Sequence, residues 1–318
     1  MKKKVKFIIT VSCYAVVICA GILLIPRLFG RTEKQESAVV GTGEVVYDAI
    51  ELAAPLYPSA PGVSVAENRH ASIDFSNVSQ GYIAVQYMGG PEDEPVVKVN
   101  YGDYEDTFKL IGEDILPLTC GDGTYTIKVY QRQKGGKYKS VLTKDLSVTL
   151  ENQLLPYLYP SQLVNYSDSS LAVQRSDEMC GEAASDLDKL KLVYGYIIDN
   201  IEYDYTKAAN VESGYIPSVD STYISKTGIC SDYSVMMAAM LRTQKIPVKL
   251  VMGYLNGTSV FHAWNEVYLK DMGWVTVNIY VDAKVFNMLD TTLAASKSDE
   301  EVAKKLSDPE FYLPVYRY

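Results

Sequence analysis

The sequence predicts an α+β protein with a membrane-crossing helix near its N-terminus. Three observations support this prediction. An uncharged apolar run lies near the start of the 318 residues, residues 71–150 alternate in short strand-like stretches, and the last part combines helical periodicity with two alternating segments. A chain of this length has room for a linker and two compact units.

Residues 1–30 are expected to form a basic tip and a single transmembrane anchor. Residues 7–25 are an uncharged run of 19 residues, which at about 1.5 Å per residue is long enough to cross a bilayer. Four lysines precede the run, so the positive-inside tendency places the N-terminus in the cytoplasm and the bulk outside the plasma membrane. The alternative is secretion after cleavage of a signal peptide, but the run is long and its cleavage site is poor.

The part of the chain beyond the anchor is acidic. It carries 25 basic and 39 acidic residues, a net charge of −14. Because nucleic-acid binding relies on Lys and Arg to neutralise phosphates, this balance argues against nucleic acid as a partner. The sequence has no Cys/His cluster with zinc spacing and no EF-hand loop, so neither a metal nor a cofactor is expected.

Residues 31–70 are rich in Pro, Ala and Gly, which is typical of a linker. One short strand is expected there at 43–47. Residues 71–150 carry alternating runs separated by glycine-containing turns, which predict an all-β immunoglobulin-like sandwich. Its many tyrosines would suit a sugar- or protein-binding face, but packing within half-buried strands is the favoured explanation.

Residues 151–185 are interpreted as a connector into a mixed unit at 186–318. Positions 187–201 keep a helical apolar stripe that begins after Ser185, a residue type that caps helices. This helix is expected to pack beside a second one further along the chain. Between them, the polar segment 206–227 has a length suited to one wall of a substrate groove.

A cysteine lies where the second helix is expected to begin. Cys230 follows a glycine-containing loop, and positions 230, 234, 237 and 241 recur at helical spacing before Pro247 stops the pattern. The free N–H groups and partial positive charge of a helix N-terminus stabilise a thiolate, which predicts a lowered pKa for this cysteine. The same N–H groups would hold an oxyanion. The alternative is an inert buried thiol.

Two alternating segments downstream carry a second candidate residue, His262. Residues 261–269 and 273–281 place most of their apolar side chains at odd-numbered positions. An antiparallel hairpin with a three-residue loop at 270–272 pairs odd residues with odd, so that the two apolar faces coincide. His262 and Asn278 then become diagonal neighbours on the opposite face. The alternative is that this polar face is simply hydrated.

Cysteine, histidine and an amide in this chain order are typical of catalysis by a thiol nucleophile. His262 would accept the proton of Cys230 and later protonate a leaving amine, while Asn278 would fix the ring tautomer. Asp282 and Asp290 are alternative carboxylates for the third role, although a turn aspartate is the favoured reading of Asp282.

Several motifs in this region together resemble the core of the bacterial transglutaminase-like superfamily. They are Gly228-Ile-Cys-Ser-Asp-Tyr, His262-Ala-Trp-Asn-Glu-Val and Gly273-Trp-Val-Thr-Val. The resemblance covers roughly residues 186–318 and implies a transglutaminase-like (papain-like) α+β fold with Cys230 and His262 in its active site. The family normally has Asp where this chain has Asn278. Papain-like proteases use Asn in the corresponding role.

Three aromatic residues are candidates for the oxyanion hole or the substrate cleft. Transglutaminases complete the oxyanion hole with an aromatic N–H, but the segment 206–227 contains no Trp or Gln, so Tyr223 is the nearest donor. Tyr205 ends the run Glu202-Tyr-Asp-Tyr, which resembles a motif that precedes the nucleophile in this family. Trp264 shares a strand face with His262.

Three cysteines lie outside the expected anchor, too few for a disulfide framework. If Cys230 is the nucleophile, Cys120 and Cys180 are more simply two unpaired structural thiols than a bridge between two units.

These features together predict a thiol enzyme that acts outside the cell on peptide or glutamine carboxamide bonds. Its partners would be protein or peptide substrates, including cell-wall-associated ones, and its thioester would be hydrolysed more readily than transferred to an amine. The alternative is a catalytically inactive transglutaminase-like scaffold, or an adhesin, that binds cell-wall or protein partners.

Overall fold

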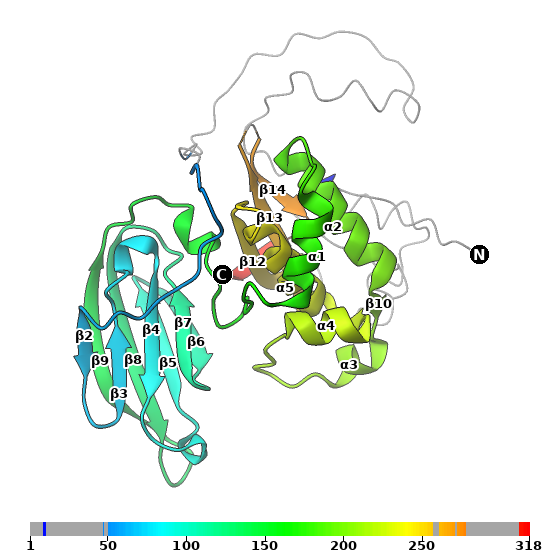
Figure 1. The fold of residues 1–318 in the computed structure, drawn as a ribbon. Helices are drawn as coiled ribbons and strands as arrows, with labels where there is room; N and C mark the ends of the chain where they lie inside the picture. Colours follow the sequence, from blue (N-terminus) through cyan, green and yellow to red (C-terminus); the bar gives the residue numbers. More distant parts are fainter. Residues whose placement is uncertain (1–8, 11–46, 48–49, 257–260, 271, 278–311) are drawn as a thin grey trace.

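The computed structural model describes residues 9–10, 47, 50–256, 261–270, 272–277 and 312–318. These residues form an N-terminal part built from strands and a C-terminal part in which helices pack against a sheet (Figure 1). Within the described ranges we find no helix with the length and hydropathy needed to cross a bilayer. Of the expected anchor at 7–25, only Ile9–Thr10 is described, as the short strand β1.

The N-terminal part contains two four-stranded antiparallel sheets. The first has the order β2-β3-β4-β7 and the second the order β6-β5-β8-β9. Their strands are β2 (Val65–Glu67), β3 (Ala71–Asp74), β4 (Tyr82–Tyr87), β5 (Val96–Tyr101), β6 (Tyr104–Lys109), β7 (Glu113–Pro117), β8 (Gly123–Arg132) and β9 (Tyr138–Val148).

The predicted alternation is confirmed in β3, β5 and β8, whereas Tyr82–Val85 of β4 are all buried. Ile73 of β3, Val85 of β4 and Val97 of β5 are fully buried, as are Ile127 and Val129 of β8. Side chains two positions apart on a strand lie on one face, and the buried faces of both sheets belong to one apolar cluster. The strand expected at 43–47 lies outside the described residues except for Tyr47.

The C-terminal part is built on a five-stranded antiparallel sheet with the order β1-β14-β13-β12-β15. Its longer strands are β12 (Val248–Leu255), β13 (Phe261–Leu269), β14 (Gly273–Val277) and β15 (Tyr312–Arg317). Two further short strands, β10 (Glu202–Tyr203) and β11 (Thr227–Gly228), pair in parallel outside this sheet.

Helix α5 (Cys230–Arg242) is the central helix of this part, and every residue from Asp232 to Arg242 is buried. It begins at Cys230, as the periodicity predicted. Helix α2 (Asp186–Asn200) is capped by Ser185, as expected, whose side chain accepts a hydrogen bond from the Asp188 N–H. The two helices pack together, since the hydroxyl of Tyr233 donates to the carbonyl of Ile201, which follows α2.

Two segments expected to lack regular structure contain helices. Helix α1 (Leu171–Cys180) lies within the segment 151–185 and packs on α5, where the hydroxyl of Ser176 donates to the carbonyl of Met240 at 2.7 Å. Helices α3 (Tyr205–Asn210) and α4 (Val219–Ser225) lie within the polar segment 206–227 or at its start. Both are capped by polar side chains, those of Asp204 and Ser218, so capping rather than an apolar stripe marks them.

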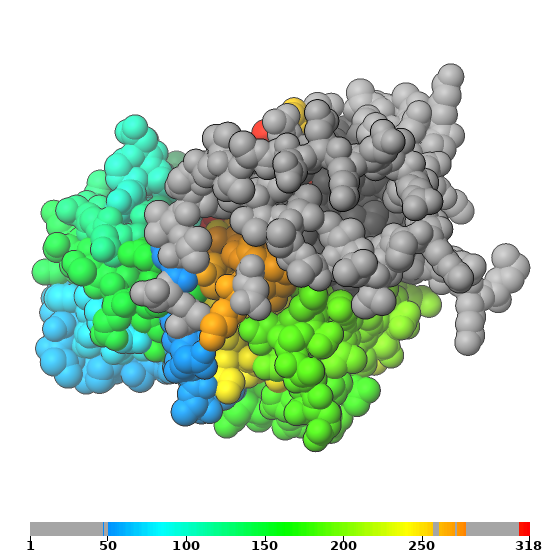
Figure 2. Space-filling model, turned by 90° about the horizontal axis from the view of Figure 1, so that it is seen from above, coloured from blue at the N-terminus to red at the C-terminus, as the bar shows by residue number. Residues whose placement is uncertain are grey.

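The sheet of the C-terminal part lies between its helices and the N-terminal sheets (Figures 1 and 2). On the helix side, the amide of Asn265 on β13 donates to the carbonyl of Ser234 on α5. On the other side, the ring of Trp274 on β14 packs edge-on against Tyr157, which belongs to the short helical turn after β9. The hydroxyl of Tyr157 donates to the carbonyl of Thr119 in the N-terminal part. Aromatic packing and hydrogen bonds therefore join the two parts.

Candidate functional site

The start of α5 is shaped by an acidic residue one turn in. Ile229 is the N-cap residue, and its backbone N–H donates to the carboxylate of Asp232 at 2.8 Å. A carboxylate in the first turn satisfies an otherwise free N–H and interacts favourably with the helix dipole. Cys230, the first residue of the helix, is thereby held at its N-terminal tip.

The loop before Cys230 needs a glycine. A Cβ added at Gly228 would lie 2.8 Å from the Cβ of Asp232, closer than side chains approach one another. Gly228 also forms part of β11, which pairs with β10 and brings Tyr203 alongside it. Within five residues, the Gly-Ile-Cys-Ser-Asp run thus contains the glycine that Asp232 approaches closely, the start of α5 at Cys230 and the acidic cap Asp232.

The thiol of Cys230 lies against strand β13. It is half-buried, and the backbone N–H groups of Ala263, Ser231 and Cys230 itself lie close enough to favour its thiolate form. Ala263 directly follows His262 in β13. The structure therefore brings the thiol to the backbone of the strand that carries the predicted histidine, while the alternation along β13 puts the His262 side chain on the face opposite that of Ala263.

The pKa of Cys230 is raised, whereas its position at a helix start predicted a lowered one. Burial is the largest cause and disfavours the thiolate, and the carboxylate of Asp232 acts in the same direction. The N–H groups of Ala263, Ser231 and Cys230 favour the thiolate but do not offset burial. In this state the thiol holds its proton at neutral pH, so a reaction at sulfur requires a base.

His262 lies near the start of β13 and is 8% exposed. It pairs with Gly253 on β12, and its ring stacks near that of Trp264 with 6.3 Å between centroids and 21° between planes. Gly253 is required by the neighbouring strand, because an added Cβ would lie 2.2 Å from the backbone oxygen of Leu313 on β15. The register of β12 against β15 shifts at this glycine. His262 therefore lies opposite the position at which β12 is irregular in its pairing with β15.

The hairpin that follows His262 has the predicted register. Val267 pairs with Val275 and Asn265 with Val277, so odd residues oppose odd ones. The strands end at Leu269 and resume at Gly273, leaving the expected three-residue loop. Asn278, the predicted third member of the triad, directly follows β14 and lies outside the described residues, as do the alternatives Asp282 and Asp290.

An aromatic group lies beside the thiol. The pKa of Tyr203 is raised, mainly by burial and next by the negative charge of a Cys230 thiolate. Because that charge acts on it, the phenol lies near the thiol. Its ring stacks on Tyr233 of α5 and packs edge-on against Tyr205, with centroids 6.2 and 5.2 Å away. Tyr205 is therefore joined to the site through Tyr203, a residue that the sequence analysis did not single out.

The other two aromatic candidates lie in different surroundings. Tyr223 on α4 stacks on Tyr196 of α2 at 6.2 Å, and Lys226 lies over its ring at 3.8 Å. The neighbouring Tyr196 raises the pKa of Tyr223, so this phenol lies on the α2 side of the helix. Trp264 is buried and packs against Tyr312 of β15 at 5.0 Å, which makes it a support for the His262 ring.

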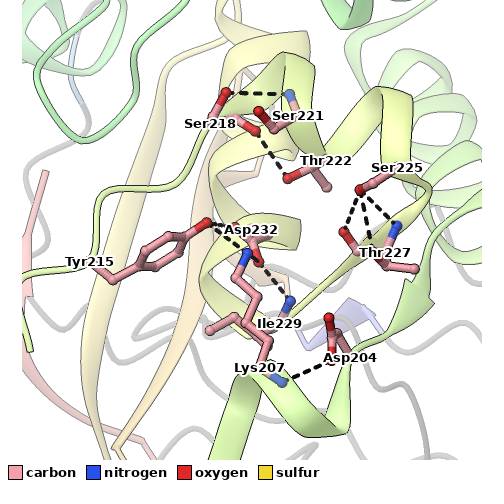
Figure 3. Close-up of polar contacts among 10 residues, drawn as sticks. All are labelled: Asp204, Lys207, Tyr215, Ser218, Ser221, Thr222, Ser225, Thr227, Ile229 and Asp232. Atoms are coloured by element: carbon pink, nitrogen blue, oxygen red, sulfur yellow. Dashed lines mark hydrogen bonds and ion pairs between the residues drawn. The ribbon is translucent and has the colours of Figure 1, made fainter. Parts of the chain in front are cut away.

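A buried ion pair lies one turn from Cys230 and was not predicted (Figure 3). The carboxylate of Asp232, 0% exposed, accepts from the ammonium of Lys207 at 2.6 Å and from the hydroxyl of Tyr215 at 2.7 Å. Lys207 also donates to the hydroxyl of Tyr215 at 2.7 Å. We call these three residues the Asp232 network.

The Asp232 network ties the segment before the nucleophile to the nucleophile helix. Lys207 lies on α3 and Tyr215 in the loop before α4, whereas Asp232 lies on α5. Burial would lower the pKa of Lys207, but hydrogen bonds to Asp232 and Tyr215 outweigh it and the pKa is raised. Only Asp232 carried a sequence signal, as part of the motif around Cys230, because the two partners are brought close by the fold.

The two other cysteines of the described residues are unpaired, as favoured from the sequence. Cys180 at the end of α1 is buried and Cys120 is half-buried. Burial raises the pKa of both thiols, which makes them poor nucleophiles.

Comparison with known proteins agrees with this geometry. Residues 173–279 match the model of the transglutaminase-like superfamily. The C-terminal part of the chain is therefore similar to the transglutaminase-like superfamily over this range, and its described helices and strands form a mixed α+β core.

Individual relatives match only part of their own length. The uncharacterized protein YebA of Bacillus subtilis (strain 168) is 32% identical over 111 residues, which are 28% of this chain and 14% of YebA. The human Kyphoscoliosis peptidase is 28% identical over 153 residues, 44% of this chain and 23% of the peptidase. The chain thus spans less than a quarter of either relative. Among solved structures, red sea bream transglutaminase is 12% identical with a TM-score of 0.27, over 62% of this chain and 47% of that one.

Proposed function

We propose that the protein is a thiol enzyme that acts on peptide or glutamine carboxamide bonds, with Cys230 as nucleophile and His262 as acid and base. The observation that carries the proposal is the position of the Cys230 thiol, at the tip of α5 and close to the backbone N–H of Ala263, the residue that follows His262. The triad is completed in this proposal by Asn278, which would orient the imidazole.

The chemistry follows from the raised pKa of Cys230. His262 removes the thiol proton as sulfur attacks the carbonyl carbon, which forms a C–S bond and an oxyanion. The backbone N–H groups at the start of α5 are donors suited to that oxyanion. The imidazolium then protonates the departing nitrogen, the C–N bond breaks and a thioester remains. Water, deprotonated by His262, cleaves the thioester to a carboxylic acid and restores the thiol.

Hydrolysis is proposed over transfer to an amine. Both reactions share the thioester, and they differ in whether water or an amine reaches it first. The human relative is named a peptidase, and its similarity to this chain supports hydrolysis as the outcome.

A peptide library tests the reaction type. The full chain is incubated with glutamine-containing peptides, with and without a primary amine, and products of wild type and Cys230→Ala are compared by mass spectrometry. Cleaved or deamidated peptides that need Cys230 support hydrolysis, and amine-coupled peptides would move the assignment to transamidation. Products that persist in Cys230→Ala would overturn the proposal.

The second candidate is a catalytically silent scaffold that binds protein or cell-wall partners. Two observations favour it, the raised pKa of Cys230 and the Asn at position 278. The scaffold hypothesis expects iodoacetamide to alkylate Cys230 at the same rate in His262→Ala as in wild type. The enzyme hypothesis expects the rate of alkylation to fall in His262→Ala, because His262 would be the base that removes the thiol proton.

We also propose an extracellular location. Residues 7–25 would anchor the chain in the plasma membrane, which requires Ile9–Thr10 to separate from β14. The two N-terminal sheets would form an immunoglobulin-like sandwich that holds the catalytic part away from the bilayer. Protein or peptide substrates at the cell surface would then be within reach. Fractionation of cells that express the full chain, followed by protease shaving, tests this arrangement.

A further inference from the structure

Three large apolar side chains form an exposed row across the sheet of the C-terminal part. They are Phe261 on β13, Tyr254 on β12 and Leu313 on β15, and they are 48%, 44% and 47% exposed. Tyr254 pairs directly with both of the others, and the rings of Tyr254 and Phe261 lie 5.3 Å apart. We call these residues the apolar row.

The register places the apolar row on the sheet face that α5 covers. Phe261, Ala263 and Asn265 alternate along β13, so their side chains share one face. Asn265 reaches the carbonyl of Ser234 inside α5. Phe261 therefore lies on the α5 face, as do its cross-strand partners.

The same strand locates the apolar row relative to the thiol. Asn265 contacts the second turn of α5 at Ser234, and the N–H of Ala263 contacts the Cys230 thiol at its first residue. Phe261 is the next same-face position, about 7 Å further along the strand. The apolar row thus begins just beyond the tip of the nucleophile helix.

Exposure of a connected apolar surface needs a reason, because soluble proteins bury or disperse such side chains. Other exposed apolar residues, such as Val63, Ile111 and Ile224, lie on separate loops or helices. The three members of the apolar row lie on neighbouring strands and contain no charged group. The only polar atom that their side chains offer is the hydroxyl of Tyr254, which disfavours a saccharide, since a sugar requires several hydrogen-bond partners.

We propose that the apolar row binds a bulky apolar side chain of the polypeptide substrate, next to the residue whose carbonyl carbon Cys230 attacks. This inference rests on the proposed function and adds its specificity: a substrate with Leu, Phe or Tyr beside the reacting residue is preferred over one with Asp, Ser or Ala. The apolar side chain would cover the exposed faces of Tyr254, Phe261 and Leu313.

The test compares peptides that differ only beside the reacting residue. For a peptide that wild type converts, the neighbouring position is varied among Phe, Leu, Ala, Ser and Asp, and kcat/KM is measured for each with the full chain. We expect the Phe and Leu peptides to exceed the Ala peptide by about tenfold or more, the range typical of apolar contacts in an enzyme site. Tyr254→Ser and Leu313→Ser should each shrink that ratio severalfold.

Two controls separate this inference from the chemistry. Ile111→Ser removes a more exposed apolar side chain in the N-terminal part and should preserve the ratio. The rate of alkylation of Cys230 by iodoacetamide should match wild type in Tyr254→Ser and Leu313→Ser, which shows an intact nucleophile. Conversion without any preference, or equal losses for all peptides, would overturn the apolar row alone. If wild type converts no peptide of the library, the proposed function fails and the specificity fails with it.

Discussion

The two ends of helix α5 each hold a fully buried charged residue, and they hold it by different means. Near the N-terminal end Asp232 is met by an ammonium, a phenol and a backbone N–H. At the C-terminal end the guanidinium of Arg242 is met by backbone carbonyls. Both charges have the sign that the helix dipole favours at their position.

The C-terminal end is closed by the main chain of three segments. Arg242 donates to the carbonyl of Val248 on β12 twice, at 3.1 and 2.7 Å, to Tyr159 at 2.6 Å and to Tyr318 at 3.0 Å. Burial lowers the pKa of Arg242 to about 10, so it stays charged at neutral pH. Within the described part of the chain no Asp or Glu side chain pairs with it. The guanidinium therefore stabilises the joint between helix, sheet and the segment from the N-terminal part.

The N-terminal end is held by side chains, and one of them is open to solvent. Lys207 is 30% exposed and comes from a six-residue helix. Because Asp232 also raises the pKa of the neighbouring Cys230 thiol, its counterion influences reactivity as well as stability. The C-terminal end of α5 therefore stabilises the fold through Arg242, whereas the N-terminal end also influences the pKa of the Cys230 thiol through Asp232.

The largest effect on stability is expected at Arg242, at the C-terminal end of α5. Arg242→Met would leave three buried carbonyls without their donor and should lower the free energy of unfolding by about 3–5 kcal/mol. Urea unfolding followed by circular dichroism measures this. Arg175→Met, at an exposed ion pair on α1, is the matched control and should cost about 0.5 kcal/mol or less. Equal costs for the two variants would contradict the role of Arg242.

Lys207→Met should have the next largest effect on stability, and it should also change the pKa of the Cys230 thiol. An unpaired carboxylate would remain buried, which should cost about 2–3 kcal/mol, less than a fully buried pair because Lys207 is partly hydrated. The uncompensated charge of Asp232 should also raise the pKa of Cys230 further. The pH profile of iodoacetamide alkylation is expected to move to higher pH.

Lys191→Met removes an exposed ion pair on α2 and serves as the control for Lys207→Met. It should leave both the unfolding free energy and the alkylation profile unchanged. A Lys207→Met profile that coincides with wild type would separate the Asp232 network from Cys230 reactivity.

The unfolding free energy should also depend on pH through Asp106, which Tyr318 links to the Arg242 end of α5. The hydroxyl of Tyr318 donates to this carboxylate at 3.2 Å, and burial raises the pKa of Asp106 to about 6. Because the folded-state pKa lies above the unfolded one, this group contributes stability below pH 4 that is lost as pH rises through 6. Relative to Asp106→Asn, the wild-type unfolding free energy should fall by about 2–3 kcal/mol from pH 4 to 7. Parallel curves for the two proteins would contradict the raised pKa.

Tyr215→Phe tests the smallest contribution. It removes one hydrogen bond to Asp232 while Lys207 and the Ile229 N–H remain, so the loss in stability should be about 1 kcal/mol. The alkylation profile should move less than in Lys207→Met. A larger effect than that of Lys207→Met would mean that the phenol, not the ammonium, holds the carboxylate.

Local patterns predicted the elements that carry the candidate site. Periodicity and the stop at Pro247 indicated a helix that begins at Cys230, and strict alternation with a three-residue loop set the register of β13 against β14. These features depend on residues close in sequence, so they can be recognised without knowledge of the fold. The short helices α3 and α4 escaped because their polar caps, not an apolar stripe, define them.

Motif, helix start and strand register follow from the order of residues, since each arises from neighbours along the chain. The pKa of Cys230 does not, because the dipole of α5 could be recognised locally while the burial that outweighs it arises only when sheet and helix pack. The Asp232 network and the apolar row likewise exist only after distant segments meet: Lys207 reaches Asp232 across 25 positions, and Leu313 joins Tyr254 through pairing of β15 with β12. Energies of burial and charge pairing depend on such distances in space, which spacing along the chain does not specify.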